Sequence, residues 1–272
     1  MKEAQRWIDK KRLSCNGHII IKKNFELFGN IEVAIFTPNT KDLKPIFQSN
    51  DFAIFDKPSG VLVHPSSRLT EYSLTHEAKF LFGKNANITH RIDKETSGLV
   101  IVSKNKKVEI DIKSLFEDRK IKKGYIALVR GKIDKELFID APIAKNREFS
   151  QIKLKVQISN DGKASQTIIK PIEYFNELNQ TIVEALPLTG RQHQIRVHLF
   201  HVKHPIVGDP IYGIDFEHAN KYLNGNLNEK DRIKITGSNR LMLHANWIEF
   251  NYKNRYKIYS QEDIYKLFKL SE

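Results

Sequence analysis

A short run near residue 90 constrains this chain more than any other feature, because it places a carboxylate beside the entrance to an apolar strand. Residues 89–103 read Thr-His-Arg-Ile-Asp-Lys-Glu-Thr-Ser-Gly-Leu-Val-Ile-Val-Ser. Residues 99–102 predict a strand buried on both faces, and Thr-Ser-Gly at 96–98 predicts the turn that enters it. We therefore expect Asp93 to be held at the rim of a rigid element, where catalytic side chains are often placed. The simpler interpretation is an aspartate that only caps a turn.

The charge balance indicates a polyanionic partner. Lysine and arginine number 45 against 32 acidic residues, a net charge of +13, and the sequence pI is about 9.6. Such an excess favours nucleic acid ahead of a membrane surface. A length of 272 residues allows one or two domains with ample core.

Cysteine usage and hydropathy indicate a cytoplasmic location. The single cysteine, Cys15, cannot form an internal disulfide. No apolar stretch approaches the roughly 20 residues needed to cross a bilayer, and the first residues lack the apolar core of a signal peptide. We expect a cytoplasmic protein with no membrane partner.

The first 47 residues read as a small separate unit. Residues 3–11 have the apolar spacing of a helix, Asn16-Gly17 predicts a hairpin turn, and residues 31–36 alternate as a strand does. Residues 38–50 are expected to form a linker.

The remainder, residues 48–272, predicts a mixed α+β domain. Thr189 is expected to cap a helix that Gly190 enters, with Gln192 at the third position of a capping box. Residues 214–238, rich in Asn, Gly and Lys, are expected to form a surface insertion. The expected strands are 52–56, 99–103, 124–131, 152–158, 164–175, 180–187 and 241–250, and the expected helices are 69–82, 105–119, 191–202 and 261–269.

Five ordered segments carry a family resemblance. The string from His90 to Leu99, His-Arg-Ile-Asp-Lys-Glu-Thr-Ser-Gly-Leu, resembles the catalytic signature of the RluA-type pseudouridine synthases, with Ile92 in place of the family's leucine. Several ordered blocks are far more specific than one motif, and the resemblance extends from about residue 52 to about residue 250. The other matching segments are Asp56–Pro65 (Asp-Lys-Pro-Ser-Gly-Val-Leu-Val-His-Pro), Lys123–Gly131 (Lys-Gly-Tyr-Ile-Ala-Leu-Val-Arg-Gly), Thr189–Asp209, which contains Gly-Arg-Gln-His-Gln-Ile-Arg-Val-His and His-Pro-Ile-Val-Gly-Asp, and Leu243–Ala245 (Leu-His-Ala).

The resemblance implies a fold and a reaction. The fold is a mainly antiparallel mixed sheet, flanked by helices around a central cleft. The reaction breaks the glycosidic bond of a uridine in RNA and rejoins the uracil through ring carbon 5, without a cofactor. The family assigns the nucleophile to Asp93, the cation that keeps it ionised and aimed to Arg196, and stacking on the uracil to Tyr125, which also assists the last proton transfer.

Four further residues are expected to bind RNA. In the family the arginine before the nucleophile, here Arg91, enters the RNA and takes the place of the extruded nucleotide, which costs a few kcal/mol to unstack. Arg191 lies five residues before Arg196 and so on a different helical face, where we expect it to hold a phosphate or a backbone carbonyl. Phosphate contacts and local hydrogen bonds are also expected of His193 and His198.

Metal and hydrolase chemistry are disfavoured. Of the histidines at 193, 198, 201 and 204, only His198 and His201 share a helical face, and no Cys or HExxH spacing accompanies them. His64 and His90 are expected to have packing roles. Thr-Ser-Gly is not a Gly-x-Ser-x-Gly elbow, and no phosphate-binding P-loop is present.

Two other classes of function remain open, a catalytically silent RNA-binding or ribosome-assembly factor and a glycosidase or base-excision enzyme. Residues 1–47 look like the later half of the alpha-L RNA-binding module, which favours large-subunit rRNA over tRNA as the substrate. We expect a monomer.

Overall fold

The computed structural model describes residues 2–24, 26–66, 70–145 and 155–270. Residue 69 of the expected helix 69–82 and residues 152–154 of the expected strand 152–158 lie outside this part. Among the helices of the described residues, none is long and apolar enough to cross a membrane.

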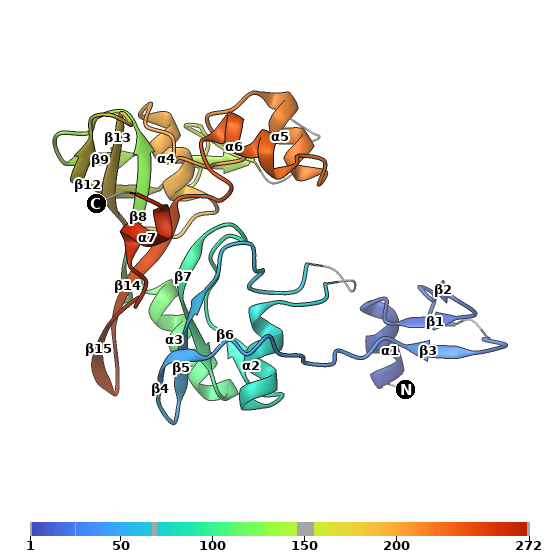
Figure 1. The fold of residues 1–272 in the computed structure, drawn as a ribbon. Helices are drawn as coiled ribbons and strands as arrows, with labels where there is room; N and C mark the ends of the chain where they lie inside the picture. The colour runs from blue at the N-terminus through green and yellow to red at the C-terminus, as the bar shows by residue number, and fades with distance from the viewer. Residues whose placement is uncertain (1, 25, 67–69, 146–154, 271–272) are drawn as a thin grey trace.

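The N-terminal unit is a helix on a small antiparallel sheet with strand order β2-β1-β3. Asn16 and Gly17 both have positive φ (48° and 78°), as the predicted Asn-Gly hairpin requires. In Figure 1 the unit stands to one side of the main body. Its elements are α1 (Lys2–Asp9), β1 (Leu13–Cys15), β2 (His18–Ile19) and β3 (Ile31–Val33).

A ten-stranded sheet forms the centre of the main body (Figure 1). Its path is β4-β5-β7-β14-β8-β13-β12-β9, with β15 added to β14 and β6 added to β7. All pairings are antiparallel except β7 with β14, which confirms the predicted fold. The strands are β4 (Pro45–Gln48), β5 (Phe52–Lys57), β6 (Asn87–Ile88), β7 (Ser97–Ser103), β8 (Lys122–Arg130), β9 (Leu137–Asp140), β12 (Gln166–Phe175), β13 (Gln180–Pro187), β14 (Leu243–Tyr252) and β15 (Asn254–Tyr259), with a separate pair β10 (Ile143–Lys145) and β11 (Val156–Ile158).

The central strand β7 is buried on both faces, which explains its uninterrupted apolar run. Val100 and Val102 belong to the larger hydrophobic cluster, while Leu99 and Ile101 pack on the other face with the third helix. Alternation of side chains along a strand produces this division. The helices are α2 (Leu74–Phe82), α3 (Lys106–Glu117), α4 (Gln194–His201), α5 (Phe216–Leu223), α6 (Glu229–Thr236) and α7 (Ile264–Phe268).

One prediction about a connecting segment was wrong, and another was incomplete. The expected linker 38–50 contains β4, which pairs with β5, because its apolar residues continue the sheet edge. The expected surface insertion 214–238 contains α5 and α6, and Asp215 and Asn228 cap these two helices with side-chain oxygens. The polar helix α6 gives little signal in its apolar spacing, whereas Phe216, Ala219 and Leu223 of α5 have a helical spacing that the prediction missed.

Candidate active site

Asp93 lies in the loop that leads into β7. The predicted turn at 96–98 is partly wrong, because Ser97 and Gly98 already belong to the strand. Gly98 has φ +110°, and a Cβ there would lie 2.3 Å from the carbonyl oxygen of Ala245 on β14. Glycine therefore allows β7 and β14 to approach, and Ser97 Oγ lies 2.8 Å from His244 Nδ1 on the same neighbour.

Arg196 contacts Asp93, although 103 residues separate the two in the sequence. Its side chain is 2% exposed, and Nη1 donates to Asp93 Oδ2 at 3.2 Å. The aspartate side chain is 22% exposed, so one carboxylate oxygen is held by the guanidinium while the group stays open to a ligand. The predicted pair is thus brought together in one site.

Asp209 orients the guanidinium and was missed from the sequence as a site residue. Arg196 Nε and Nη2 donate to its two oxygens at 2.7 and 2.8 Å, and the backbone N–H groups of Ile211 and Tyr212 donate to Oδ1. Burial alone would raise the pKa of Asp209, but Arg196 and these N–H groups lower it. A two-point pair of this kind fixes the plane of the guanidinium. The sequence signal that could have revealed Asp209 is the Gly-Asp pair that ends the fourth matching segment.

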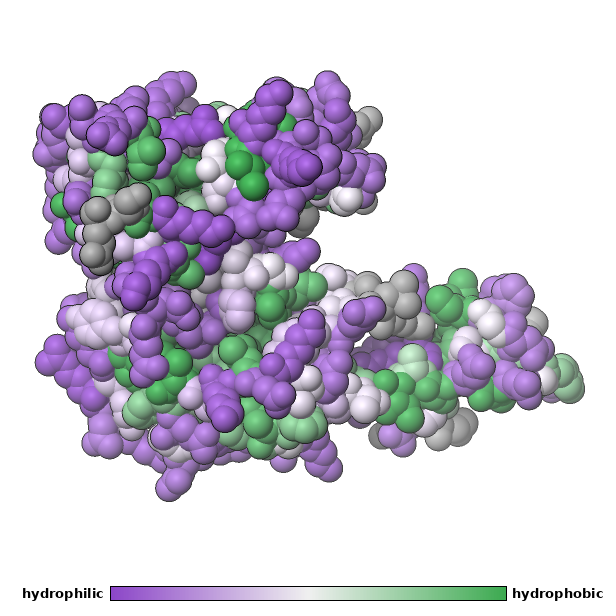
Figure 2. All heavy atoms as spheres, viewed as in Figure 1, coloured by the Kyte–Doolittle hydropathy of each residue, from purple (hydrophilic) through white to green (hydrophobic). Residues whose placement is uncertain are grey.

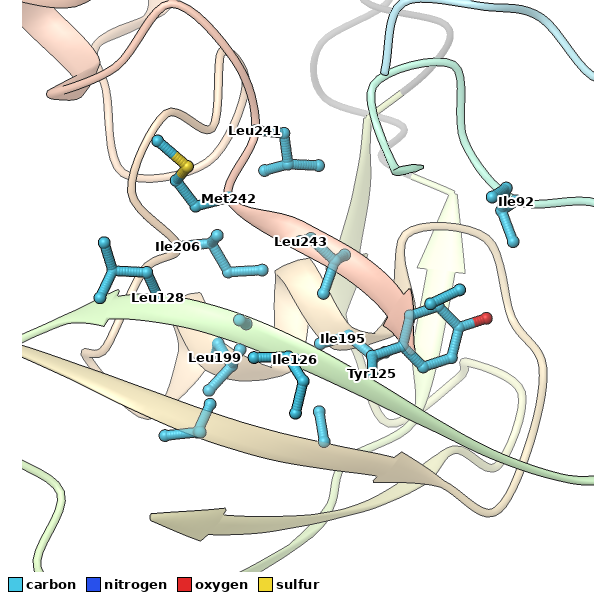
Figure 3. Packing of buried hydrophobic residues seen from close by; sticks show 14 of the residues in the cluster. Ile92, Tyr125, Ile126, Leu128, Ile195, Leu199, Ile206, Leu241, Met242 and Leu243 are labelled. Atoms are coloured by element: carbon cyan, nitrogen blue, oxygen red, sulfur yellow. The ribbon is translucent and has the colours of Figure 1, made fainter. Parts of the chain in front are cut away.

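Tyr125 lies on β8 at the floor of the site. It is 9% exposed, and Figure 3 shows its ring beside Ile195 and Leu243, with the hydroxyl directed away from them. Burial, and next the charge of Asp93, raise the pKa of Tyr125 above its ordinary value. The hydroxyl is therefore protonated at neutral pH.

His193 lies near the carboxylate as a neutral ring. Its Nε2 is 3.8 Å from Asp93 Oδ2, and its Nδ1 is 3.1 Å from the hydroxyl of Tyr212. Burial, and next Arg196, lower the pKa of His193 to about 4, so it forms no ion pair at neutral pH. Tyr212 also lies 5.2 Å below the Arg196 guanidinium and was missed as a site residue.

The two expected RNA-binding arginines line the same cavity as Asp93, which has a volume of about 90 Å³. Arg91 is exposed. Arg191 donates from Nε to the carbonyl of Ala164 at 3.3 Å, as one of its two predicted roles requires.

His198 does not line this cavity. Its side chain is fully buried, with Nε2 2.9 Å from the carbonyl oxygen of Ala141 and Nδ1 2.9 Å from Thr167 Oγ1. The local hydrogen bonds expected of His198 are present, whereas the expected RNA contact was wrong, because the fully buried ring joins α4 to the sheet.

The helix that carries Arg196 begins later than expected. α4 starts at Gln194, and the preceding residue, His193, has φ +52°. Thr189 was predicted to be the N-cap, but its hydroxyl donates to Gln194 Oε1, which also accepts from the backbone N–H of Arg191. The side-chain amide closes a loop over residues 189–194, and this loop replaces the first turn of the predicted helix.

Two basic side chains, the buried Lys57 and the partly buried Arg232, brace the Asp93 loop from outside the cavity. Lys57 Nζ donates to the carbonyls of Pro58, Val61 and Lys94. Arg232 of α6 pairs with Glu95, two residues after the aspartate, at 2.6 Å. Lys57 belongs to the matching segment Asp56–Pro65, whereas Arg232 lies in the predicted insertion 214–238 and had no sequence signal.

Protonation of His193 should make the fold sensitive to acid. The unfolded ring binds a proton near pH 6.5 and the folded ring only near pH 4. Between these values the unfolded state binds more protons, so the free energy of unfolding falls as pH is lowered. Between pH 7 and pH 5, protonation at this one site lowers the free energy of unfolding by roughly 2 kcal/mol.

Urea unfolding at the two pH values measures this effect. His193→Gln should show a smaller acid-induced loss than the wild type, and His201→Gln, on the far end of α4, serves as a control. Equal losses in the wild type and in His193→Gln would contradict a neutral buried ring.

Comparison with known proteins identifies the class of enzyme. The model of a family described as RNA pseudouridylate synthase matches residues 51–201, which is more than half of the chain. The chain belongs to the RNA pseudouridine synthase family. As a pseudouridine synthase it is an isomerase that converts uridine in RNA to pseudouridine, and the predicted RluA-type membership is confirmed.

Relatives support the same assignment. An "Uncharacterized RNA pseudouridine synthase" of Helicobacter pylori is 40% identical over 96% of this chain and 87% of the relative. "Ribosomal large subunit pseudouridine synthase C" of Yersinia pestis is 36% identical over 77% of this chain and 61% of the relative. The solved structure of "Human RNA Pseudouridylate Synthase Domain Containing 1" has a TM-score of 0.65 and 24% identity, covers 84% of this chain and 86% of its own, and supports the fold.

Proposed function

We propose that this synthase modifies uridines in large-subunit rRNA, with Asp93 as the nucleophile. The observation that carries the assignment is the contact between Asp93 Oδ2 and a buried arginine that Asp209 holds in a two-point pair. The rRNA assignment is supported by relatives named for the large ribosomal subunit, one of them 36% identical.

The proposed reaction conserves all atoms of the nucleoside. Asp93 attacks the ribose or the base of the extruded uridine, and the bond between ribose carbon 1 and uracil nitrogen 1 breaks. The uracil turns, and ring carbon 5 bonds to ribose carbon 1 while the bond to Asp93 breaks and frees the carboxylate. Carbon 5 then releases its proton, and nitrogen 1 gains one. Arg196 keeps the carboxylate ionised and oriented, because a guanidinium within hydrogen-bond reach favours the charged form.

Extrusion of the uridine is the role we propose for Arg91. The residue is exposed and comes two positions before Asp93, at the open side of the cavity. A side chain that enters the RNA offsets part of the unstacking cost of a few kcal/mol. We propose that Arg191 and His193 border the same nucleotide, because both line the cavity with Asp93.

Incubation with an rRNA transcript that carries tritium at uracil carbon 5 tests this proposal. An isomerase releases tritium and leaves a carbon-linked nucleoside. A silent RNA-binding factor releases none, and a base-excision enzyme leaves free uracil. Mapping of pseudouridines in total RNA with and without the protein then identifies the target.

Tyr125→Phe should fold and bind RNA but lose the last proton transfer, at a cost of roughly 10² to 10⁴ in turnover. The phenyl ring keeps its packing in the core and its stacking surface, so the hydroxyl alone is tested. Single-turnover formation of pseudouridine is the measurement, with Tyr174→Phe on β12 as the control. Normal turnover of Tyr125→Phe would show that the hydroxyl is dispensable.

We also propose that residues 1–47 are a partial RNA-binding module and that residues 48–272 are the catalytic domain, with β4 at 45–48 crossing this boundary. Exposed cations of the N-terminal unit support the first part. Lys11→Gln combined with Lys22→Gln should weaken RNA binding and leave saturated turnover unchanged. Unchanged affinity in a filter-binding assay would contradict it.

A further inference from the structure

A second and larger groove adjoins the cavity that holds Asp93. We call it the α3 groove, because Lys113, Phe116 and Glu117 of α3 line one side of it, and its volume is about 620 Å³. It shares Arg91 and Arg191 with the Asp93 cavity of about 90 Å³. The Asp93 cavity is smaller than sites that enclose small ligands, which have volumes of about 300–1,000 Å³. The RNA that flanks an inserted uridine must therefore lie outside this cavity.

Charge in the α3 groove is strongly one-sided. Five basic side chains line it against one carboxylate, Glu117, although Lys113 also pairs with Glu109 and burial lowers the pKa of Lys123. Within the described part of the chain, neither Arg91 nor Arg119 forms an ion pair, and both are exposed. Guanidinium groups in this state suit phosphate. The five basic side chains are Arg91, Lys113, Arg119, Lys123 and Arg191.

An apolar floor lies among these charges. The ring of Phe116 is 4.5 Å from that of His90 and lies under Lys123 Nζ at 5.9 Å. His90 is neutral, because burial lowers its pKa to about 3, and its Nε2 accepts from the backbone N–H of Ile101. Leu188, which is 44% exposed, also lines the groove.

We propose that the α3 groove binds the RNA strand that flanks the target uridine, with phosphates on Arg119 and Lys113 and a base against Phe116 and Leu188. Cationic grooves with aromatic platforms bind single strands in this manner, because the charges follow the backbone and every base has a stacking face. The inference rests on the proposed function, since it takes the strand to be continuous with a uridine at Asp93.

Figure 2 shows hydrophilic residues over most of the face that it draws, and a hollow between the α5–α6 region and the part of the molecule below it. The α3 groove is formed where α3 and β8 meet the segment 187–191. It therefore predicts RNA contacts on α3, a helix to which no catalytic motif assigns a role.

Arg119→Gln and Lys120→Gln form a matched pair of variants. The two residues are adjacent and exposed, and each change removes one positive charge, but Lys120 pairs with Asp118 and does not line the groove. Affinity for a large-subunit rRNA transcript tritiated at uracil carbon 5 is measured from 50 to 300 mM salt. Tritium release from the same samples gives kcat and KM.

Arg119→Gln should bind roughly fivefold more weakly near 0.1 M salt, and its plot of log affinity against log salt should be shallower by about 0.7–0.9. Its KM should rise while kcat stays that of the wild type. Lys120→Gln should stay within about twofold of the wild type. Adding Lys113→Gln to Arg119→Gln should lower the slope by about the same amount again.

Equal slopes for Arg119→Gln and Lys120→Gln would overturn the proposed strand path. The single variants decide this even where the double variant is destabilised, since Lys113 also pairs with Glu109. A wild-type protein that binds the transcript but releases no tritium would contradict the proposed chemistry, and the salt slopes would still decide the groove.

Discussion

Asp93→Asn should abolish tritium release from RNA labelled at uracil carbon 5. Asparagine has nearly the same shape as aspartate, and its oxygen can still accept from Arg196, so the site should keep its geometry. The amide has no negative charge with which to attack ribose or to stabilise a sugar cation. We expect a loss of at least about 10⁴ in single-turnover rate, or about 5.4 kcal/mol of transition-state stabilisation.

The RNA affinity of the variant shows whether activity is lost because the nucleophile is missing or because the site is damaged. Asp93→Asn should bind the transcript within a few-fold of the wild type, since its cationic neighbours are unchanged. Asp134→Asn, an exposed residue between β8 and β9, controls for the charge change and should turn over normally. Substantial residual activity of Asp93→Asn would falsify the assignment of the nucleophile.

The parts of this molecule that sequence predicted are those with a strong local pattern. The apolar run 99–102 predicted a strand buried on both faces, and β7 packs both rows of its side chains. Asn16-Gly17 predicted its hairpin because both residues tolerate positive φ. The contact between Asp93 and Arg196 has no such local origin, and only the family resemblance joined the two residues.

The parts that sequence missed depend on tertiary contacts. Gln194 closes the loop over residues 189–194 with its side-chain amide, and this overrode a capping pattern at Thr189. His198 and Arg196 belong to the same helix, yet one joins it to the sheet and the other enters the site. Arg232 reaches Glu95 from a polar helix whose composition resembles that of a loop.

Arg196→Met should have two effects with different causes. It removes the cation that orients Asp93, and it leaves the carboxylate of Asp209, 1% exposed, without its partner. Breaking a buried ion pair on one side costs about 3–5 kcal/mol of folding free energy. We expect a severe loss of activity together with a lower midpoint of urea unfolding, so activity alone cannot assign a role to Arg196.

The double variant Arg196→Met with Asp209→Asn separates the two effects. Asparagine at 209 carries no charge, and its oxygen can still accept from the backbone N–H groups of Ile211 and Tyr212. Most of the lost stability should return, because replacing both members of a buried pair is often neutral. Activity should remain at least about 10³-fold below wild type, since no cation orients Asp93. A stable double variant with near-normal tritium release would remove Arg196 from the chemistry and leave it as a structural partner of Asp209.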